Sequence, residues 1–206
     1  MFKNIKNIFW DFDGVLIDSN NIRTNGFREI FHEHPRNLVD QLIEYHFKNG
    51  GLSRYDKIKY FYEKILKKSI SKTQVVEYSN SYKSIMLNHL LNKKFLINDS
   101  LNFIKNNNSK NMFLVSASDE KELTIICEYL DLKKYFIEIK GSRTTKKNNL
   151  KNLLCEYNLE SVDSVLIGDS FNDYEAAKFN EINFYGYNNK SLQSYDYIEK
   201  FQDLEI

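Results

Sequence analysis

The 206-residue sequence has few cysteines, little net charge and no long apolar run, and each shortage excludes a class of protein. The two cysteines, Cys127 and Cys155, lie in apolar segments with a helical pattern. We expect buried free thiols in a reducing compartment rather than a disulfide framework or a nucleophile. The 29 basic residues nearly balance the 28 acidic residues, so no general positive field favours nucleic acid or an anionic membrane as a partner.

Near its start the sequence contains only a short uninterrupted apolar run, residues 8–10. This run is too short for the hydrophobic part of a signal peptide or for a membrane-spanning helix. We therefore expect a cytoplasmic protein that acts on a small molecule, as a monomer or a homodimer. No nucleic acid or membrane partner is expected.

Short apolar runs alternate with longer helical patterns, which is typical of a parallel sheet covered by helices on both faces. The strands are expected at residues 5–10, 112–115, 136–139, 165–167 and 182–185. The helices between them are expected near residues 100–107, 119–129, 147–157 and 173–180. The sequence predicts an α/β fold with a doubly wound, parallel, five-strand, Rossmann-like core.

This alternation is interrupted between about residue 20 and about residue 91, where only amphipathic helical patterns occur. The simplest interpretation is an α-helical cap at residues 19–91, inserted into a core formed by residues 1–18 and 92–206. The expected hinges lie near Ser19 and near residues 92–94. All four histidines fall in this cap without metal-ligand spacing, so we assign none of them to a site.

The first predicted strand continues into DFDGVLIDS, which places Asp11 and Asp13 beyond the carboxyl end of a strand, where open α/β sheets bind ligands. Two neighbouring carboxylates repel each other unless a cation or a proton lies between them, and Mg²⁺ is a hard cation that carboxylates bind. Gly14 permits a sharp turn that brings backbone amides towards a bound anion. Alone, this segment is equally compatible with an ordinary polar turn.

Residues suited to phosphate binding follow the ends of later predicted strands. The run MFLV ends at Ser116, whose hydroxyl could hold a phosphoryl oxygen together with the neighbouring amides of Ala117 and Ser118. Lys146 and Lys147 lie at the start of a predicted helix, where either ammonium group could neutralise a phosphate.

The run SVLI ends in GDSFND, where Asp169 can ligate a metal ion and Asp173 follows one helical turn later on the same side. The ends of the strands thus supply a nucleophile, a hydroxyl group, a cation and metal-binding carboxylates. Phosphoryl transfer requires little more, because its catalysis consists mostly of positioning and charge neutralisation.

On these motifs the sequence resembles the haloacid dehalogenase superfamily over nearly its whole length. DFDGVLIDS is similar to the first motif of that family, VSAS to the second, the region of Lys146 to the third and GDSFND to the fourth. The resemblance implies that Asp11 is the nucleophile and a metal ligand, and that Asp13 is the general acid and base with its backbone carbonyl on the metal. It also favours Lys146 over Lys147, because the family commonly places this lysine four residues before the first apolar helix residue, here Leu150.

The expected cap resembles that of the subgroup containing phosphoglycolate phosphatases and β-phosphoglucomutase. GGLSRYDK is similar to the mutase segment whose arginine binds the substrate's phosphate group remote from the reacting centre. This similarity implies a substrate contact for Arg54. An arginine in the first turn of a helix is, however, usually solvated. The mutase has a histidine where this sequence has Arg23, a second candidate substrate contact, and a lysine where it has Asp119. An acidic residue there would repel a remote phosphate and weakens the mutase assignment.

The sequence therefore predicts a magnesium-dependent phosphatase that hydrolyses a small phosphorylated metabolite, such as a sugar phosphate, through a phospho-aspartyl intermediate. One alternative is a β-phosphoglucomutase-like phosphomutase with the same core. Another is a binding or regulatory module of this fold without turnover, against which the presence of Asp11, Asp13, Ser116, Lys146 and Asp169 argues.

Overall fold

The computed structural model describes residues 2–142 and 144–204 and has a parallel sheet at its centre. Within these residues the sheet has six strands in the order β3-β2-β1-β4-β5-β6. They are β1 (Asn7–Trp10), β2 (Asn111–Val115), β3 (Glu138–Lys140), β4 (Ser164–Gly168), β5 (Asn183–Tyr187) and β6 (Tyr197–Ile198). The predicted doubly wound α/β class is confirmed, but the predicted number of five strands is one too few.

The strand that the sequence pattern missed is β6. It contains two residues, Tyr197 and Ile198, and pairs with the end of β5. A strand this short shows neither an alternation nor an apolar run, so its pairing becomes visible only in the folded chain. The predicted strand at 136–139 also begins too early, because the apolar Phe136 follows a 3₁₀ turn and precedes β3.

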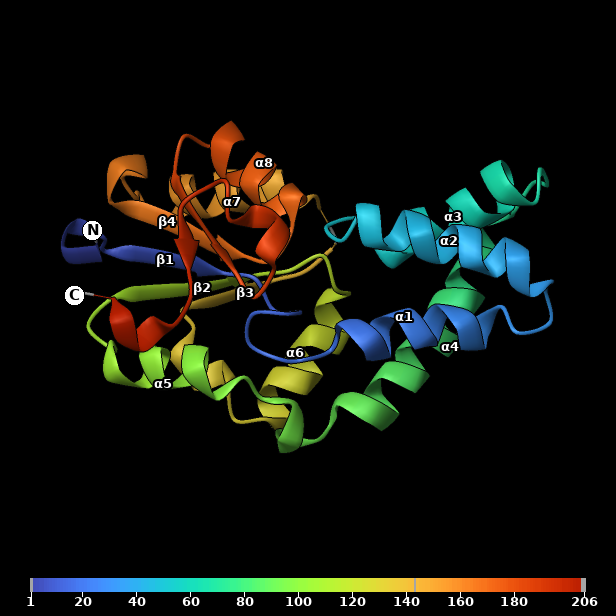
Figure 1. Ribbon diagram of the computed structural model, residues 1–206, viewed down its shortest axis with the longest axis horizontal. Coiled ribbons are helices and arrows are strands. Elements are labelled where there is room, and N and C mark those ends of the chain that lie inside the picture. The colour runs from blue at the N-terminus through green and yellow to red at the C-terminus, as the bar shows by residue number, and fades with distance from the viewer. Residues whose placement is uncertain (1, 143, 205–206) are drawn as a thin grey trace.

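Helices cover both faces of the sheet, as Figure 1 shows. On one face lie α5 (Asn98–Asn106) and α6 (Glu120–Tyr129), and on the other lie α7 (Lys146–Glu156) and α8 (Phe171–Phe179). The side chains of β1 alternate accordingly: Ile8 and Trp10 pack in the cluster of α5 and α6, and Phe9 packs in the cluster of α7 and α8. All three are fully buried, so β1 contributes apolar burial to both faces.

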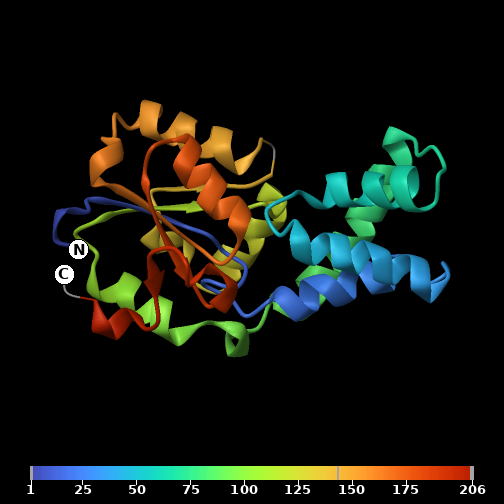
Figure 2. The same ribbon diagram turned by 45° about the horizontal axis from the view of Figure 1, so that its top comes forward.

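All regular secondary structure between residues 19 and 91 is helical, and this segment stands to one side of the sheet (Figures 1 and 2). We call residues 19–91 the cap and the remaining described residues the core. The cap consists of α1 (Asn20–Ile30), α2 (Arg36–Lys48), α3 (Arg54–Tyr60), the π-helical turn η2 (Phe61–Ile65) and α4 (Lys72–Leu90). Buried aromatic rings join these helices; the ring centroids of Phe31 and Phe61, for example, are 4.3 Å apart.

The two segments that connect the cap to the core are bonded to each other. Ile17 and Leu96 form an antiparallel bridge, and the Asp18 amide donates to the Phe95 carbonyl over 2.8 Å. We call these four residues the hinge ladder. They lie close to the hinges expected near Ser19 and residues 92–94.

The thiols and helices test the expectations drawn from composition. Cys127 on α6 is buried as expected, but the prediction is wrong for Cys155, which is exposed. Cys155 lies on the solvent side of α7, whereas Leu150 and Leu153 of the same helix face the sheet and are buried. Within residues 2–142 and 144–204, no helix has both the length and the apolar character needed to cross a membrane.

Candidate active site

A cavity of about 400 Å³ lies where the carboxyl ends of the central strands face the cap. The strands β2, β1 and β4 are neighbours in the sheet, so the residues that follow them meet at one edge. Asp11 follows β1, Ser116 follows β2 and Asp169 follows β4, and all three line the cavity. Lys146, the first residue of α7, also lines it.

Three carboxylates come together on the core side of this cavity. Asp11, Asp169 and Asp173 each offer one carboxylate oxygen within 4.8 Å of the others. Burial, together with the charge of Asp173, raises the pKa of Asp11 well above its usual range although Lys146 opposes the shift. Burial and Asp173 also raise the pKa of Asp169 to about 7. Carboxylates held this close resist ionisation unless positive charge lies among them, so the donor set fits a divalent cation that prefers oxygen ligands.

Lys146 supplies part of that positive charge. Its Nζ lies 2.8 Å from Asp11 Oδ1 and also pairs with Asp173 Oδ1. The other oxygen of Asp173 accepts hydrogen bonds from the Ser170 amide (3.0 Å) and hydroxyl (2.6 Å). Three groups, the Lys146 ammonium and the amide and hydroxyl of Ser170, therefore hold the Asp173 carboxylate at the start of α8. Asp169 Oδ2 accepts one hydrogen bond, from the Asn20 side chain at 2.9 Å. Asp11 and Asp169 are the carboxylates better placed to accept a cation.

The turn after β1 depends on Gly14. Its φ is +76°, a backbone conformation that side chains with a Cβ rarely adopt. A Cβ at this position would lie 2.0 Å from Asp169 Oδ2. Glycine therefore allows the loop after β1 to approach the loop after β4 and bring Asp11 and Asp169 together.

The side chain of Asp13 points away from the three clustered carboxylates. Its Oδ1 accepts hydrogen bonds from Ser19 Oγ (2.5 Å) and Arg23 Nε (2.8 Å), and its Oδ2 accepts one from Ser118 Oγ (2.8 Å). Burial alone would raise the pKa of Asp13, but the charge of Arg23 and these hydrogen bonds lower it below its usual value. Asp13 is thus a carboxylate in this state.

The second predicted motif lies beside Asp13 and lines the cavity. Ser116 is buried, and its hydroxyl accepts a hydrogen bond from the Ser118 amide over 3.1 Å. Ala117 lies between them in the cavity wall. Of the two candidate lysines, Lys146 is the one directed at Asp11, whereas Lys147 Nζ lies 5.5 Å from the ring centroid of Phe179.

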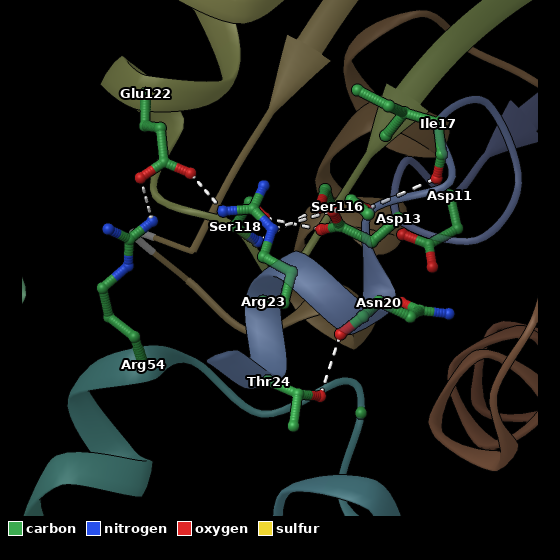
Figure 3. A network of polar contacts seen from close by, with 12 residues as sticks. Asp11, Asp13, Ile17, Asn20, Arg23, Thr24, Arg54, Ser116, Ser118 and Glu122 are labelled. Carbon is green, nitrogen blue, oxygen red and sulfur yellow. Dashed lines mark hydrogen bonds and ion pairs between the residues drawn. The ribbon is translucent and has the colours of Figure 1, made fainter. Parts of the chain in front are cut away.

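Arg23 and Arg54 meet at a residue that the sequence did not reveal, Glu122 (Figure 3). Glu122 lies in the first turn of α6 and is fully buried. Arg54 Nη2 donates to its Oε2 over 2.6 Å, and Arg23 Nη1 pairs with its Oε1. Tyr82 completes the group: its hydroxyl donates to the Arg23 carbonyl over 2.9 Å, and its ring centroid lies 4.7 Å from Arg54 Cζ. Arg23 and Arg54, two arginines of the cap, are thereby paired with a carboxylate of the core.

The sequence pattern does not distinguish Glu122 from an ordinary residue at the start of a helix. Asp119 and Glu122 have the spacing of a helix-capping pair, and such glutamates usually face solvent. Asp119 does cap α6, accepting from the Glu122 amide over 3.2 Å, and its other oxygen accepts from Tyr55 Oη over 2.9 Å. Asp119 is absent from the described lining of the cavity, so it binds the cap instead of facing a ligand.

Two further cap residues line the cavity without having been expected there, Lys57 and His46. Lys57 Nζ donates to His46 Nδ1 over 2.9 Å and to the Gly50 carbonyl over 3.3 Å. Burial lowers the pKa of Lys57 to about 7, and burial followed by the charge of Lys57 lowers the pKa of His46 to about 3. His46 is therefore neutral, with Nδ1 as the acceptor. A lone histidine and a lysine in a helical pattern gave no indication of this pair.

Comparisons with known proteins agree with this geometry. The family model described as haloacid dehalogenase-like hydrolase matches residues 8–187. No curated protein matches the chain.

Solved structures share the fold over nearly the whole chain. One is β-phosphoglucomutase from Clostridium difficile, with 14% identity, coverage of 98% of this chain and 94% of that chain, and a TM-score of 0.77. Another is a predicted phosphoglycolate phosphatase from Haemophilus somnus, with 14% identity, 98% and 96% coverage and a TM-score of 0.73. A third is the hydrolase YfnB from Bacillus subtilis bound to magnesium, with 14% identity, 98% and 97% coverage and a TM-score of 0.70. At such low identity these similarities establish the fold and no more.

Proposed function

The chain belongs to the haloacid dehalogenase-like hydrolase family, and from that premise we propose that it is a magnesium-dependent phosphatase acting on a small phosphorylated metabolite, such as a sugar phosphate. The observation that carries this proposal is the cluster of Asp11, Asp169 and Asp173, two of which bind Lys146 beside the cavity. A nucleophilic carboxylate next to concentrated positive charge is what transfer of a phosphoryl group to an aspartate requires.

Magnesium would be held by one carboxylate oxygen each from Asp11 and Asp169, with the backbone carbonyl of Asp13 as a further ligand. Asp173 would join them by exchanging one of its present hydrogen bonds. When bound, the cation supplies positive charge to the phosphoryl oxygens. The all-oxygen donor set and the raised pKa of Asp11 support this assignment.

In the first step, a carboxylate oxygen of Asp11 attacks phosphorus and forms the phospho-aspartyl intermediate. The bond between phosphorus and the ester oxygen breaks, and the leaving oxygen takes a proton from Asp13. Lys146 neutralises the phosphoryl oxygens, and the Ser116 hydroxyl with the amide of Ala117 holds one of them. The approach of the phosphate's negative charge would raise the pKa of Asp13 and supply the protonated form that this step requires.

In the second step, Asp13 acts as the base. Its carboxylate takes a proton from a water molecule, whose oxygen attacks phosphorus. The bond between phosphorus and Asp11 breaks, which releases inorganic phosphate and restores the enzyme. Hydrogen bonds from Ser19, Arg23 and Ser118 favour the carboxylate form of Asp13 and support this role.

The surroundings of Arg54 favour hydrolysis over the phosphomutase alternative. A mutase must hold a second phosphate at the far end of its substrate, and Arg54 is the residue that the resemblance assigns to it. Here Arg54 is already paired with Glu122. A remote phosphate could reach only the unpartnered Nη1 of Arg54 and would share this arginine with a buried carboxylate, whose like charge disfavours a second anion there.

We extend the proposal to the setting of the enzyme. A nearly neutral chain with two free thiols fits a cytoplasmic enzyme, monomeric or homodimeric, with no nucleic acid or membrane partner. Residues 19–91 would act as a cap that selects the leaving group, over a catalytic core of residues 1–18 and 92–206.

The experiment that tests the function is an assay of phosphate release on a panel of sugar phosphates, with Mg²⁺ or with EDTA. We expect Mg²⁺-dependent release that EDTA abolishes and that Asp11→Asn reduces to below about a hundredth of wild type. Release in the presence of EDTA would reject the metal site. Conversion of a sugar 1-phosphate to its 6-phosphate without free phosphate would assign the enzyme as a mutase. Absence of any turnover would favour a non-catalytic module.

A further inference from the structure

Lys57 is a buried cation in the wall of the cavity that has no carboxylate partner. The residue belongs to α3, is only 3% exposed and lines the cavity. Its ammonium group donates to two neutral acceptors, the imidazole of His46 and the carbonyl of Gly50. None of the ion pairs within residues 2–142 and 144–204 includes Lys57.

The other buried cations that line the cavity differ from Lys57 in this respect. Each of them is neutralised by at least one buried carboxylate: Arg23 by Asp13 and Glu122, Arg54 by Glu122, and Lys146 by Asp11 and Asp173. An unpaired charge in such surroundings destabilises a fold. A ligand that carried a negative charge to Lys57 would remove this cost, so the lysine is explained by binding rather than by stability.

We propose that Lys57 binds a carboxylate at the far end of the substrate, so that the substrate is the phosphate ester of a small organic acid, such as a sugar acid. This inference rests on the proposed function, which places the phosphoryl end of the substrate at Asp11. An ammonium group has three N–H donors, and two are used by His46 and Gly50. The third is available for a charge-assisted hydrogen bond to the ligand.

The charges around Lys57 favour a carboxylate over a second phosphate. A carboxylate brings one negative charge to Lys57, which has no carboxylate partner among the described residues, whereas a phosphate dianion would bring two. Arg54 Nη1 has no hydrogen-bond partner and could still donate to the ligand, but the single positive charge of Arg54 is already balanced by Glu122. The pKa of Lys57, lowered by burial to about 7, leaves the ammonium form accessible, and an anionic ligand would stabilise it further.

The test compares matched phosphate esters that differ only at the far end. Glycerol 3-phosphate is paired with 3-phosphoglycerate, glucitol 6-phosphate with 6-phosphogluconate, and fructose 6-phosphate with fructose 1,6-bisphosphate. Binding is measured by calorimetry at about pH 6.5 with Mg²⁺, on Asp11→Asn so that the esters stay intact. We expect at least one acid to bind about tenfold or more tightly than its alcohol, as a charge-assisted hydrogen bond provides.

Adding Lys57→Met should bring the acid-to-alcohol ratio close to one. The matched control is Lys59→Met, because Lys59 lies two residues further along α3 and is exposed; this change should leave the ratio as it was. Equal binding of acid and alcohol in both acid–alcohol pairs, or a preference that survives Lys57→Met, would overturn the proposal. Tight binding of the bisphosphate alone would also overturn it.

A second measurement keeps the test decisive if Lys57→Met does not fold. With Lys57 in place, the acid-to-alcohol ratio should fall as the pH rises from about 6 to about 9, because the ammonium group of the free protein loses its proton. A constant ratio would contradict the proposal. The charged and titratable groups that face Lys57 come from every neighbouring element: His46 of α2, Asp13 of the loop after β1, Arg23 of α1, and Arg54 and Asp56 of α3. These neighbouring groups affect the binding of both esters of a pair, so the acid-to-alcohol ratio reports only the contact at the far end.

These measurements separate the inference from the proposed function. Acid-selective binding that depends on Lys57, without phosphate release by the unmodified enzyme, would support the carboxylate site and reject the phosphatase. Phosphate release without acid selectivity would support the phosphatase and reject the carboxylate site.

Discussion

At the scale of single residues, Glu122 connects the part of the cap that lines the cavity to the core. It binds Arg54 directly, and it binds Arg23, which in turn donates to Asp13. The position of the proposed acid and base therefore depends on a carboxylate that touches neither the phosphoryl site nor Asp13. Such a residue acts by positioning, and its loss should affect stability and catalysis together.

Glu122→Gln should lower the free energy of unfolding by roughly 3 kcal/mol, because among the described residues Arg54 loses its one carboxylate partner and Arg23 keeps only Asp13. Urea titration measures this change. The matched control is Glu128→Gln on the same helix, whose pair with Lys133 is more than half exposed on both sides, so that its loss should cost less than about 1 kcal/mol. Equal losses in the two variants would show that the buried pairs contribute no more than an exposed one.

Lys57→Met should stabilise the fold, and the gain should depend on pH. Burial lowers the pKa of Lys57 from the ordinary lysine value of 10.5 to about 7 in the folded protein. Between these two values the unfolded chain binds a proton that the folded chain lacks, so the wild type gains stability as the pH rises. The advantage of Lys57→Met should therefore be largest below pH 7, at roughly 2–4 kcal/mol, and shrink by about pH 9.5. Urea titrations of both proteins at the two pH values measure it, and a variant less stable at the lower pH would contradict this account.

At the scale of elements, the turn before α3 brings the cap into contact with the start of α8. The Gly51 amide donates to the Asn172 side chain over 3.4 Å, and a Cβ on Gly51 would lie 2.4 Å from the Asn172 Cβ. The neighbouring Gly50 has more room, since a Cβ there would lie 3.4 Å from that of Ser170. The close contact between the cap and α8 thus depends on Gly51 more than on Gly50.

Gly51→Ala should hold the cap away from the core. We expect kcat/KM on the best phosphate ester to fall about tenfold or more, because small displacements of substrate-positioning groups reduce turnover strongly. The loss on p-nitrophenyl phosphate should be smaller, since a minimal substrate makes few cap contacts. Steady-state kinetics on both substrates measures the difference. Gly50→Ala is the control, and a loss as large as that of Gly51→Ala would show that the close contact is not the cause.

The elements also show what the sequence could and could not predict. The apolar runs predicted the central strands and hence placed Asp11, Ser116 and Asp169 at one edge, because side chains after parallel strands must meet there. They could not predict Glu122 or Lys57. Each of these residues lies in an amphipathic helix where a charged side chain normally faces solvent, and only the packing of the cap against the core buries them.

At the scale of the whole molecule, stability should depend on the metal ion. Burial and the neighbouring Asp173 carboxylate raise the pKa of both Asp11 and Asp169, so their charged forms are unfavourable in the absence of a cation. At about pH 8, Mg²⁺ at a hundred times its dissociation constant should raise the thermal midpoint by roughly 5–10 °C. Thermal unfolding with Mg²⁺ and with EDTA measures this rise. Asp169→Asn should reduce it, whereas Asp196→Asn, at an exposed position, should not. Equal midpoints with Mg²⁺ and with EDTA would argue against the metal site.

The hinge ladder gives the molecule a modular construction. Because Ile17 and Leu96 pair directly, the cap leaves and re-enters the core at almost the same place. The sheet would form whether residues 19–94 or a short turn joined the two sides of the ladder, since lengthening a closed loop adds only slowly to its entropic cost. A foreign cap grafted between the two sides of the ladder would therefore leave the strand order intact while presenting a new wall to the ligand. To keep Asp13 and Asp169 in place, the graft would have to retain Ser19, Asn20 and Arg23, which donate hydrogen bonds to them. With these residues retained, substrate preference in such an architecture can be exchanged as a unit.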